Sequence, residues 1–397
     1  MILQEMEKRM RFEELRTPCY VIDEAKLEQN LETLKGVMYR TGAKILLAQK
    51  AFSAFCEYPL IAKYLTGTTA SGLFEAKLAN EEMDSTDTGN KENHVFCPAF
   101  LPEEMDELVT ICDHIVFNSI NQYKAHEDAI KSHPGVSVGL RINPECSTQE
   151  GHAIYDPCAA GSRLGITREA LDKAIEEGFD FGGIEGLHFH TLCEQNSDDL
   201  KKTLEAVESS FGDLLYGIKW LNMGGGHHIT RDDYDIKTLE ECILHMKDKY
   251  KLEIYLEPGE AIALNAGYLK TTVLDIVENG GIKILILDTS AACHMPDVLE
   301  MPYRPPLKYS GEAGEKKFTY RLSSCTCLAG DVIGDYSFDN EINIGDVLVF
   351  EDMAIYSMVK NNTFNGMPLP DIDVMDKNGN CRVVKRFGYE DFKSRLS

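Results

Sequence analysis

The stretch "KILLAQKAFS" at residues 44–53 runs through several apolar residues to a single amine, Lys50. The apolar run is typical of a short buried strand. A lysine at the end of such a strand can simply reach water, or it can serve as the reactive amine of a buried site. This stretch alone leaves both alternatives open, and the rest of the chain must distinguish them.

Similar short runs alternate with helical patterns between residues 40 and 260. The eight predicted strands are 44–50, 68–71, 94–98, 114–118, 136–142, 186–190, 220–225 and 253–258. Thr167 and Ser197 are predicted to cap the helices that follow them. Eight strands alternating with helices predict a (β/α)8 TIM-like barrel, with a doubly wound open sheet as the alternative.

After Tyr268 the pattern changes to strand-like runs with few helices. The predicted strands there are 270–277, 282–288, 317–324, 345–352, 354–359 and 381–386. The early run "PCYVID" at 18–23 can join their sheet. We therefore expect an α/β barrel over 24–268 and an all-β domain, a β-sandwich or β-barrel, formed by 1–23 with 269–397. The connection 143–165 lacks periodicity and is predicted to be a lid or binding loop.

The charge and cysteine content narrow the classes of partner. With 40 basic and 65 acidic residues the net charge is −25, which disfavours nucleic acid and anionic lipid and favours cationic small molecules. No apolar run is long enough to span a membrane and the amino end does not resemble a signal peptide, so a cytoplasmic protein is expected. The 12 cysteines form no CxxC pair and are expected to be free thiols.

Unusual residues follow several predicted strands at the end where barrel enzymes place their active sites. Lys50 ends the first strand, His190 the sixth and Glu257 the eighth. After the seventh strand come three glycines, Gly224, Gly225 and Gly226. Such a run is either a tight turn or a loop whose backbone N–H groups bind an anion.

Together these residues supply an amine, a phosphate cradle, a ring for stacking and a carboxylate for a ring nitrogen. That combination predicts a pyridoxal phosphate site, with no metal. The competing interpretation is a metal-dependent barrel hydrolase that uses the imidazoles of "HFH" (188–190) and "HH" (227–228). It needs further ligands at the same rim, it leaves Lys50 without a role, and the deeper His188 fits a core histidine.

Several motifs recur in one order along the chain. They are "TPCYVID" (17–23), "LAQKAFS" (47–53), "TASGLFEAKLA" (69–79), "GLHFHTLCE" (186–194), "NMGGGHH" (222–228), "EPGEA" (257–261), "CLAGD" (327–331) and "MVKNNTFNGM" (358–367). Over nearly its whole length the chain resembles the fold-type III pyridoxal phosphate decarboxylases, which are related to alanine racemase, ornithine decarboxylase and diaminopimelate decarboxylase. Within that family its motifs are most similar to those of the group that acts on carboxynorspermidine and carboxyspermidine.

The resemblance implies roles for individual residues. Lys50 would attach to the cofactor, His190 would stack on its ring, the three glycines would hold its phosphate, and Glu257 would pair with its ring nitrogen. Cys327 would return a proton to the decarboxylated carbon across the interface of a homodimer with shared active sites. The other implied cofactor or substrate residues are Arg141, Asp288, Arg304, Tyr356 and Phe364.

Two positions depart from the better-known relatives. Where ornithine and diaminopimelate decarboxylases carry "EPGR", this chain has Glu260, and after Cys327 it has Leu328 where relatives place an acid. Both changes favour a longer, polyamine-like substrate, with Asp331 predicted to bind its distal ammonium. The alternatives are a decarboxylase of the diaminopimelate, ornithine or arginine type and a non-catalytic cofactor-binding relative. A racemase is disfavoured because the cysteine replaces the tyrosine that it uses as second base.

Overall fold

The chain forms two compact units, one over Asn30–Ile262 and one that joins Met1–Gln29 to Ala263–Ser397. The computed structural model describes residues 10–83, 91–149 and 156–397. The predicted lid at 143–165 therefore falls partly outside the described residues, and its role stays a prediction. The predicted domain boundaries, before residue 24 and after 268, lie close to the limits of these units.

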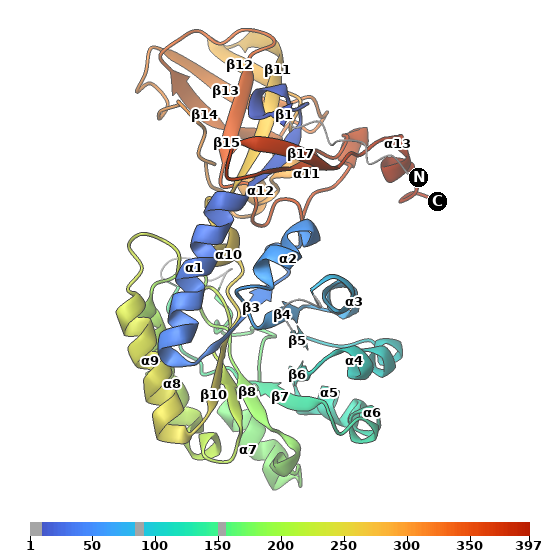
Figure 1. The fold of residues 1–397 in the computed structure, drawn as a ribbon, viewed down its shortest axis with the longest axis vertical. Helices are drawn as coiled ribbons and strands as arrows, with labels where there is room; N and C mark the ends of the chain where they lie inside the picture. Colours follow the sequence, from blue (N-terminus) through green and yellow to red (C-terminus); the bar gives the residue numbers. More distant parts are fainter. Residues whose placement is uncertain (1–9, 84–90, 150–155) are drawn as a thin grey trace. The chain divides into compact units, whose positions relative to one another are not determined.

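The unit Asn30–Ile262 is a closed barrel of parallel strands (Figure 1). Its strands are β3 (Lys44–Ala48), β4 (Gly67–Ala70), β5 (Glu92–Cys97), β6 (His114–Phe117), β7 (Ser137–Arg141), β8 (Gly186–His188), β9 (Trp220–Asn222) and β10 (Glu253–Leu256). Strand β10 pairs in parallel with both β9 and β3, which closes the ring. The eight predicted strands and the barrel are confirmed, and the open sheet is excluded.

Helices alternate with these strands. They are α1 (Glu24–Thr41), α2 (Tyr58–Ile61), α3 (Leu73–Glu82), α4 (Met105–Ile111), α5 (Ile120–Ala125), α6 (Glu127–Ser132), α7 (Arg168–Glu176), α8 (Ser197–Leu215), α9 (Ile236–Tyr250) and α10 (Glu260–Ala263). Thr167 caps α7 as predicted, because its hydroxyl accepts from the N–H of Ala170. The predicted cap of α8 is wrong by one residue. Asn196 is the N-cap, because its side chain accepts from both Ser197 N and Asp235 N.

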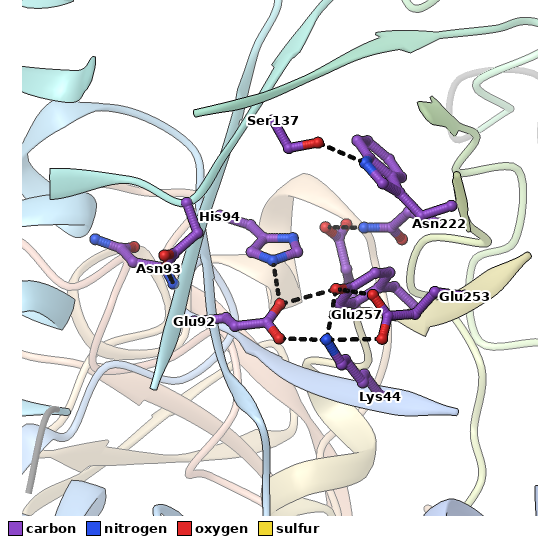
Figure 2. A network of polar contacts seen from close by, with 11 residues as sticks. Lys44, Glu92, Asn93, His94, Ser137, Asn222, Glu253 and Glu257 are labelled. Atoms are coloured by element: carbon purple, nitrogen blue, oxygen red, sulfur yellow. Dashed lines mark hydrogen bonds and ion pairs between the residues drawn. The ribbon is translucent and has the colours of Figure 1, made fainter. Parts of the chain in front are cut away.

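The amino ends of the barrel strands meet in a charged layer (Figure 2). Lys44 Nζ lies 2.5 Å from a Glu92 oxygen and 2.8 Å from a Glu253 oxygen. The Tyr255 hydroxyl lies 2.9 and 2.8 Å from the other oxygens of these two carboxylates. Trp220 fills the interior so tightly that a Cβ at Gly186 would lie 2.0 Å from its ring. This end of the barrel is closed by packing and ion pairs, and reactive groups must be sought at the other end.

The second unit is built on one nine-stranded, mostly antiparallel sheet. Its strands are β1 (Met10–Arg11), β2 (Cys19–Asp23), β11 (Gly267–Asn279), β12 (Ile282–Leu287), β13 (Phe318–Ser324), β14 (Val332–Phe338), β15 (Val347–Glu351), β16 (Asp371–Met375) and β17 (Asn380–Lys385). They lie in the order β1-β17-β16-β2-β11-β12-β13-β14, and β15 pairs with β11. The unit also holds the short helices α11 (Ala291–His294), α12 (Asp297–Glu300) and α13 (Tyr389–Lys393). The predicted all-β domain is confirmed, including the early strand.

Strand β2 lies between β16 and β11 in the sheet, and an apolar core covers each of its faces. Tyr20 packs into one apolar core with Leu269 and Phe350, whereas Cys19 and Val21 pack into another. One predicted strand is wrong, since 354–359 forms bends in which Tyr356 has a positive φ of 48°. Strands β14 and β16 were missed because each carries aspartates, which strands disfavour.

No helix in the described residues combines the length and apolar character needed to cross a bilayer.

Candidate active site

Lys50 lies in a tight turn just beyond the carboxyl end of β3, which ends at Ala48, two residues before the predicted end of the strand. The preceding Gln49 is fully buried and fixes this turn: its amide donates to the Glu75 carbonyl oxygen at 2.9 Å and accepts from the Tyr58 hydroxyl at 3.0 Å. Lys50 itself remains exposed. The buried glutamine therefore anchors the segment that presents the amine.

The electrostatic surroundings of Lys50 favour its neutral form. Desolvation by the surrounding protein lowers the pKa of Lys50, and the nearby Arg141 guanidinium lowers it further, against the opposing charge of Glu257. A neutral amine is the nucleophilic form of lysine. The alternative of a lysine that serves only to reach water does not account for this setting.

Glu257 follows β10 and is buried, with 7% of its surface exposed. One oxygen lies 3.0 Å from His188 Nε2. The other accepts from Asn222 Nδ2 at 2.7 Å (Figure 2). Burial alone would raise the pKa of Glu257, but these partners outweigh it and lower the pKa to about 2. Glu257 is thus a buried, ionised carboxylate that retains unused lone pairs.

His190 lies just beyond β8 and is neutral. The Gly225 N–H donates to His190 Nδ1 at 2.9 Å, which places the ring proton on Nε2. Burial lowers the pKa of His190 well below its usual value, and the charges of Lys50 and Arg141 lower it further. The imidazole is therefore fixed in one tautomer beside the glycine loop, and its stacking on a cofactor stays a prediction.

The three glycines allow a close approach of backbone segments. A Cβ at Gly225 would lie 2.4 Å from the Glu257 carbonyl oxygen, and one at Gly226 would lie 2.0 Å from that of Leu192. The N–H of Gly224 donates to Asn222 Oδ1 at 2.9 Å, and that of Gly225 donates to His190 Nδ1. Two of the three amides thus have partners within the barrel unit, and phosphate binding by the loop stays a prediction.

Arg141, the predicted barrel arginine, is buried at the end of β7. Its Nη2 donates to the His190 carbonyl oxygen at 3.1 Å, and its guanidinium carbon lies 4.6 Å from the centre of the Phe96 ring. Burial lowers the pKa of Arg141 to about 10, despite the attraction of Glu257. Arg141 still carries its charge at neutral pH, and a substrate contact remains a prediction.

The histidines of the two His-containing motifs have separate partners. His188 pairs with Glu257 and His190 with Gly225, while His227 Nε2 lies 3.2 Å from the Met223 carbonyl oxygen and His228 Nε2 lies 2.7 Å from Glu260. They do not converge on one point as metal ligands must.

Within residues 10–83, 91–149 and 156–397, the one group with metal-like proximity is Glu92, His94 and His114, near the charged layer. There the Lys44 ammonium already pairs with Glu92. The two imidazoles stack at 4.0 Å with their planes inclined by 19°, so that the lone pairs of their nitrogens do not converge on one ion. The hydrolase alternative therefore has no ligand set at the described rim.

The remaining predicted site residues belong to the β-domain. Cys327 is exposed, and its N–H donates to Asn365 Oδ1 at 2.7 Å, which places it beside the segment that carries Phe364. Phe364 is 51% exposed and Leu328 is 43% exposed. A thiol and two large apolar side chains are thus presented together on one surface of this unit.

Asp331 is buried within the β-domain and is 1% exposed. Its Oδ2 accepts from the hydroxyls of Ser290, Ser324 and Thr326, and its Oδ1 accepts from the N–H of Ala292. These four hydrogen bonds tie Asp331 to its own unit, and a contact with a substrate ammonium stays a prediction.

The other predicted substrate residues also have partners within the β-domain. Asp288 accepts from the Thr271 hydroxyl at 2.6 Å and from Thr272 N at 2.9 Å. Arg304 pairs with Glu312 and lies 4.5 Å from the centre of the Tyr336 ring. Asp288, Arg304, Tyr356 and Phe364 keep their roles only as predictions.

Sequence reasoning missed Asn222, which joins Glu257 to the glycine loop. It also took His188 for a core histidine without a role in the site. The available signal was the alternation of side chains in β8 and β9, which directs His188 and Asn222 into the barrel one layer below the rim.

A parallel barrel with an activated lysine and a buried carboxylate at its rim, joined to an antiparallel β-domain, defines a class of pyridoxal-dependent enzymes. The chain belongs to the pyridoxal-dependent decarboxylase family: the family described as "Pyridoxal-dependent decarboxylase, C-terminal sheet domain" matches residues 19–354.

Relatives within this family are similar to the chain over nearly its full length. The chain is 40% identical to a carboxynorspermidine/carboxyspermidine decarboxylase of Campylobacter jejuni, over 97% of this chain and 100% of that protein. It is 39% identical to a carboxyaminopropylagmatine decarboxylase of Synechocystis, over 97% of both chains. The crystal structure of Campylobacter jejuni carboxynorspermidine decarboxylase complexed with norspermidine superposes with a TM-score of 0.87 at 40% identity, over 96% of this chain and 100% of that one. These matches confirm the family and its fold.

Proposed function

We propose that this protein is a pyridoxal phosphate-dependent decarboxylase of carboxynorspermidine and carboxyspermidine that yields norspermidine and spermidine in polyamine biosynthesis. The observation that supports it most is a lysine whose pKa is lowered by desolvation and by Arg141, together with an ionised, buried glutamate that acts on that lysine electrostatically at the same barrel rim. Full-length similarity to relatives named for this activity supports the choice of substrate. A cytoplasmic homodimer is part of the proposal and rests on the resemblance.

The residues of the barrel fit pyridoxal phosphate. The cofactor needs an amine for its aldehyde, an acceptor for its protonated ring nitrogen and donors for its phosphate. Lys50 supplies the amine and Glu257 the acceptor, with lone pairs to spare beyond its bonds to His188 and Asn222. In the glycine loop only glycine fits, because a Cβ at Gly224, Gly225 or Gly226 would lie within 2.4 Å of a neighbouring carbonyl oxygen.

The mechanism assigns each residue one task. When bound, pyridoxal phosphate provides an electron-accepting ring that makes loss of an α-carboxylate feasible. Lys50 would hold the cofactor through its amine, and the lowered pKa of Lys50 favours the nucleophilic form that this role requires. Glu257, ionised under all physiological conditions, holds a proton on the ring nitrogen. His190 remains neutral and so adds no positive charge beside the ring.

Cys327 is the proposed proton donor to the carbon that has lost its carboxylate. Its exposed thiol on the β-domain suits a group that completes the active site of a second subunit. The apolar Leu328 beside it suits a methylene chain more than an ammonium group.

The second candidate substrate is carboxyaminopropylagmatine, because the relative that carries this name is almost as similar as the first. That substrate ends in a guanidinium, whereas the carboxylated triamines end in an ammonium. A planar guanidinium prefers two acceptors side by side, so the two substrates are expected to differ strongly in KM.

The test is release of carbon dioxide by the purified protein with added pyridoxal phosphate. Carboxynorspermidine, carboxyspermidine, carboxyaminopropylagmatine, ornithine, arginine and diaminopimelate are compared at equal concentration. We expect the carboxylated triamines to give the highest kcat/KM. Preference for carboxyaminopropylagmatine would favour the second candidate, and preference for a short diamino acid would overturn the substrate assignment. No release with any of them, from a protein that still binds the cofactor, would indicate a non-catalytic relative.

The Lys50→Ala variant is the control for the cofactor site. Borohydride reduction of the wild-type protein should fix one cofactor to the peptide that contains Lys50, and the variant should show neither this adduct nor turnover. An active variant would overturn the role of Lys50.

A further inference from the structure

We propose that His188 is a positioning residue of the decarboxylation, which acts as a neutral donor that holds Glu257 in one orientation and in its ionised form. The inference rests on the proposed function, since Glu257 matters for the reaction only if it faces the cofactor. From the sequence, His188 was interpreted as a core histidine without a role in the site.

The geometry places His188 directly behind Glu257. Its Nε2 lies 3.0 Å from one oxygen of the carboxylate, and both side chains are almost completely buried. The ring stacks on Phe96, with centroids 5.5 Å apart and planes inclined by 19°, so packing holds the imidazole in place. A carboxylate that accepts a hydrogen bond from a rigid donor has little freedom to rotate away from the ring nitrogen that it would face.

The surroundings determine which form His188 adopts. Its Nδ1 is buried and has no hydrogen-bond partner in the described residues. Two cations, Arg141 on β7 and Lys50 beyond β3, face it and oppose a positive imidazole, and burial lowers the pKa of His188 further against the attraction of Glu257. With Glu257 ionised, the ring proton must sit on Nε2 and point at the carboxylate.

Asn222 on the neighbouring strand β9 donates the second hydrogen bond to Glu257. Its amide nitrogen donates to the second Glu257 oxygen at 2.7 Å, and its amide oxygen accepts from Gly224 N at 2.9 Å. Because the amide cannot be ionised, the pair of donors on Glu257 stays neutral, and the charge of the carboxylate remains available to the ring nitrogen. The two neutral donors, His188 and Asn222, stabilise the negative charge of Glu257 without neutralising it.

Two substitutions separate the hydrogen bond from the packing. His188→Leu keeps an apolar side chain but removes the donor, whereas His188→Gln places an amide nitrogen the same number of bonds from Cα. We expect His188→Leu to lower kcat by about 10- to 100-fold, the range typical when a group that orients a catalytic ligand is lost. KM should change far less, and His188→Gln should recover most of the activity.

The pH profile provides a readout that loss of packing would not move. Without its donor the buried Glu257 has a higher pKa, so the acidic limb of the His188→Leu profile should shift to higher pH. The His188→Gln profile should stay close to that of the wild type. His126→Gln is the matched control, because His126 is also buried and packs on Phe100 and Phe117 between α5 and α6.

A measurement without cofactor tests the tautomer directly. In ¹⁵N NMR spectra of the histidine-labelled apoprotein, the signals absent from His188→Gln identify His188. We expect a protonated Nε2, an unprotonated Nδ1 and no titration between about pH 6 and 9. A proton on Nδ1, or a charged ring at neutral pH, would overturn the inference even if His188→Leu failed to fold.

The kinetic outcomes are also distinct. If the wild type decarboxylates a substrate but His188→Leu retains its kcat and pH profile, the inference fails and the proposed function stands. If the wild type neither binds pyridoxal phosphate nor releases carbon dioxide, the proposed function fails, and the inference fails with it.

Discussion

Glu260 and His228 are hydrogen-bonded at the barrel rim, with Oε2 of the glutamate 2.7 Å from Nε2 of the histidine. The glutamate begins α10 and the histidine follows the glycine loop, so this hydrogen bond joins the two segments next to the proposed phosphate position. The resemblance to ornithine and diaminopimelate decarboxylases implies an arginine at the position of Glu260. This chain therefore has a carboxylate, held by a histidine, where the resemblance implies a fixed positive charge.

The first prediction concerns substrate binding by Glu260. If the substrate is a carboxylated polyamine, Glu260→Gln should raise its KM about 10-fold or more, because an ionic hydrogen bond to an ammonium is lost. The change in kcat should be smaller, since the amide oxygen can still accept from His228. Glu240→Gln is the control, because Glu240 pairs with Arg40 on the barrel surface. An unchanged KM would restrict Glu260 to holding His228.

The second prediction distinguishes the two thiols of "CTC". Cys327→Ala should lower kcat by about 10²- to 10⁴-fold if Cys327 is the proton donor, as expected for loss of a general acid. Cys325→Ala should change kcat little, because the Cys325 Sγ contacts Met367 Sδ at 3.5 Å within its own unit. The rate and the identity of the amine product are measured together. A Cys327→Ala enzyme with full rate and the normal product would make this thiol an ordinary surface cysteine.

The third prediction tests the close packing of the glycine loop. Gly225→Ala forces a methyl group to within 2.4 Å of the Glu257 carbonyl oxygen and 3.1 Å of the His190 ring. We expect the free energy of unfolding of the apoprotein to fall by about 1 to 3 kcal/mol and the Kd for pyridoxal phosphate to rise. At Gly135 an added methyl meets no atom within 4 Å, so Gly135→Ala should change both quantities little. Denaturant unfolding and cofactor titration of the two variants decide the question.

The fourth prediction follows from Asp373 on β16, which is 2% exposed and has one oxygen without a hydrogen-bond partner in the described residues. Burial raises the pKa of Asp373 to about 6. Because the folded state binds this proton more tightly than the unfolded state, its contribution to stability is complete at low pH and is lost as the pH rises through about 6. Asp373→Asn should therefore stabilise the protein by about 2 to 3 kcal/mol at pH 8 and by almost nothing near pH 4. Equal stabilisation at both values would refute the assignment.

The sequence was a good guide to the barrel and a poorer guide to the hydrogen bonds of the site. Apolar runs located all eight barrel strands, because strands buried on both faces leave that pattern. Strands β14 and β16 escaped, since their aspartates are satisfied by partners outside the strand: Asp335 pairs with Arg321 on β13, and Asp371 pairs with Arg16 from the other end of the chain. For the same reason no pattern showed that Oδ2 of Asp331 accepts from Ser290, Ser324 and Thr326.

The position of β2 has a consequence for biosynthesis. Residues 19–23 leave the ribosome early, yet the two strands that flank them, β11 and β16, are translated only after the barrel sequence has been made. In the nascent chain, β2 thus has no partner strand until β11 is made, and its second edge stays unpaired until translation reaches residue 375. A premature stop before β16 would leave a complete barrel sequence attached to a sheet with an open edge at its centre, which is a template for aggregation.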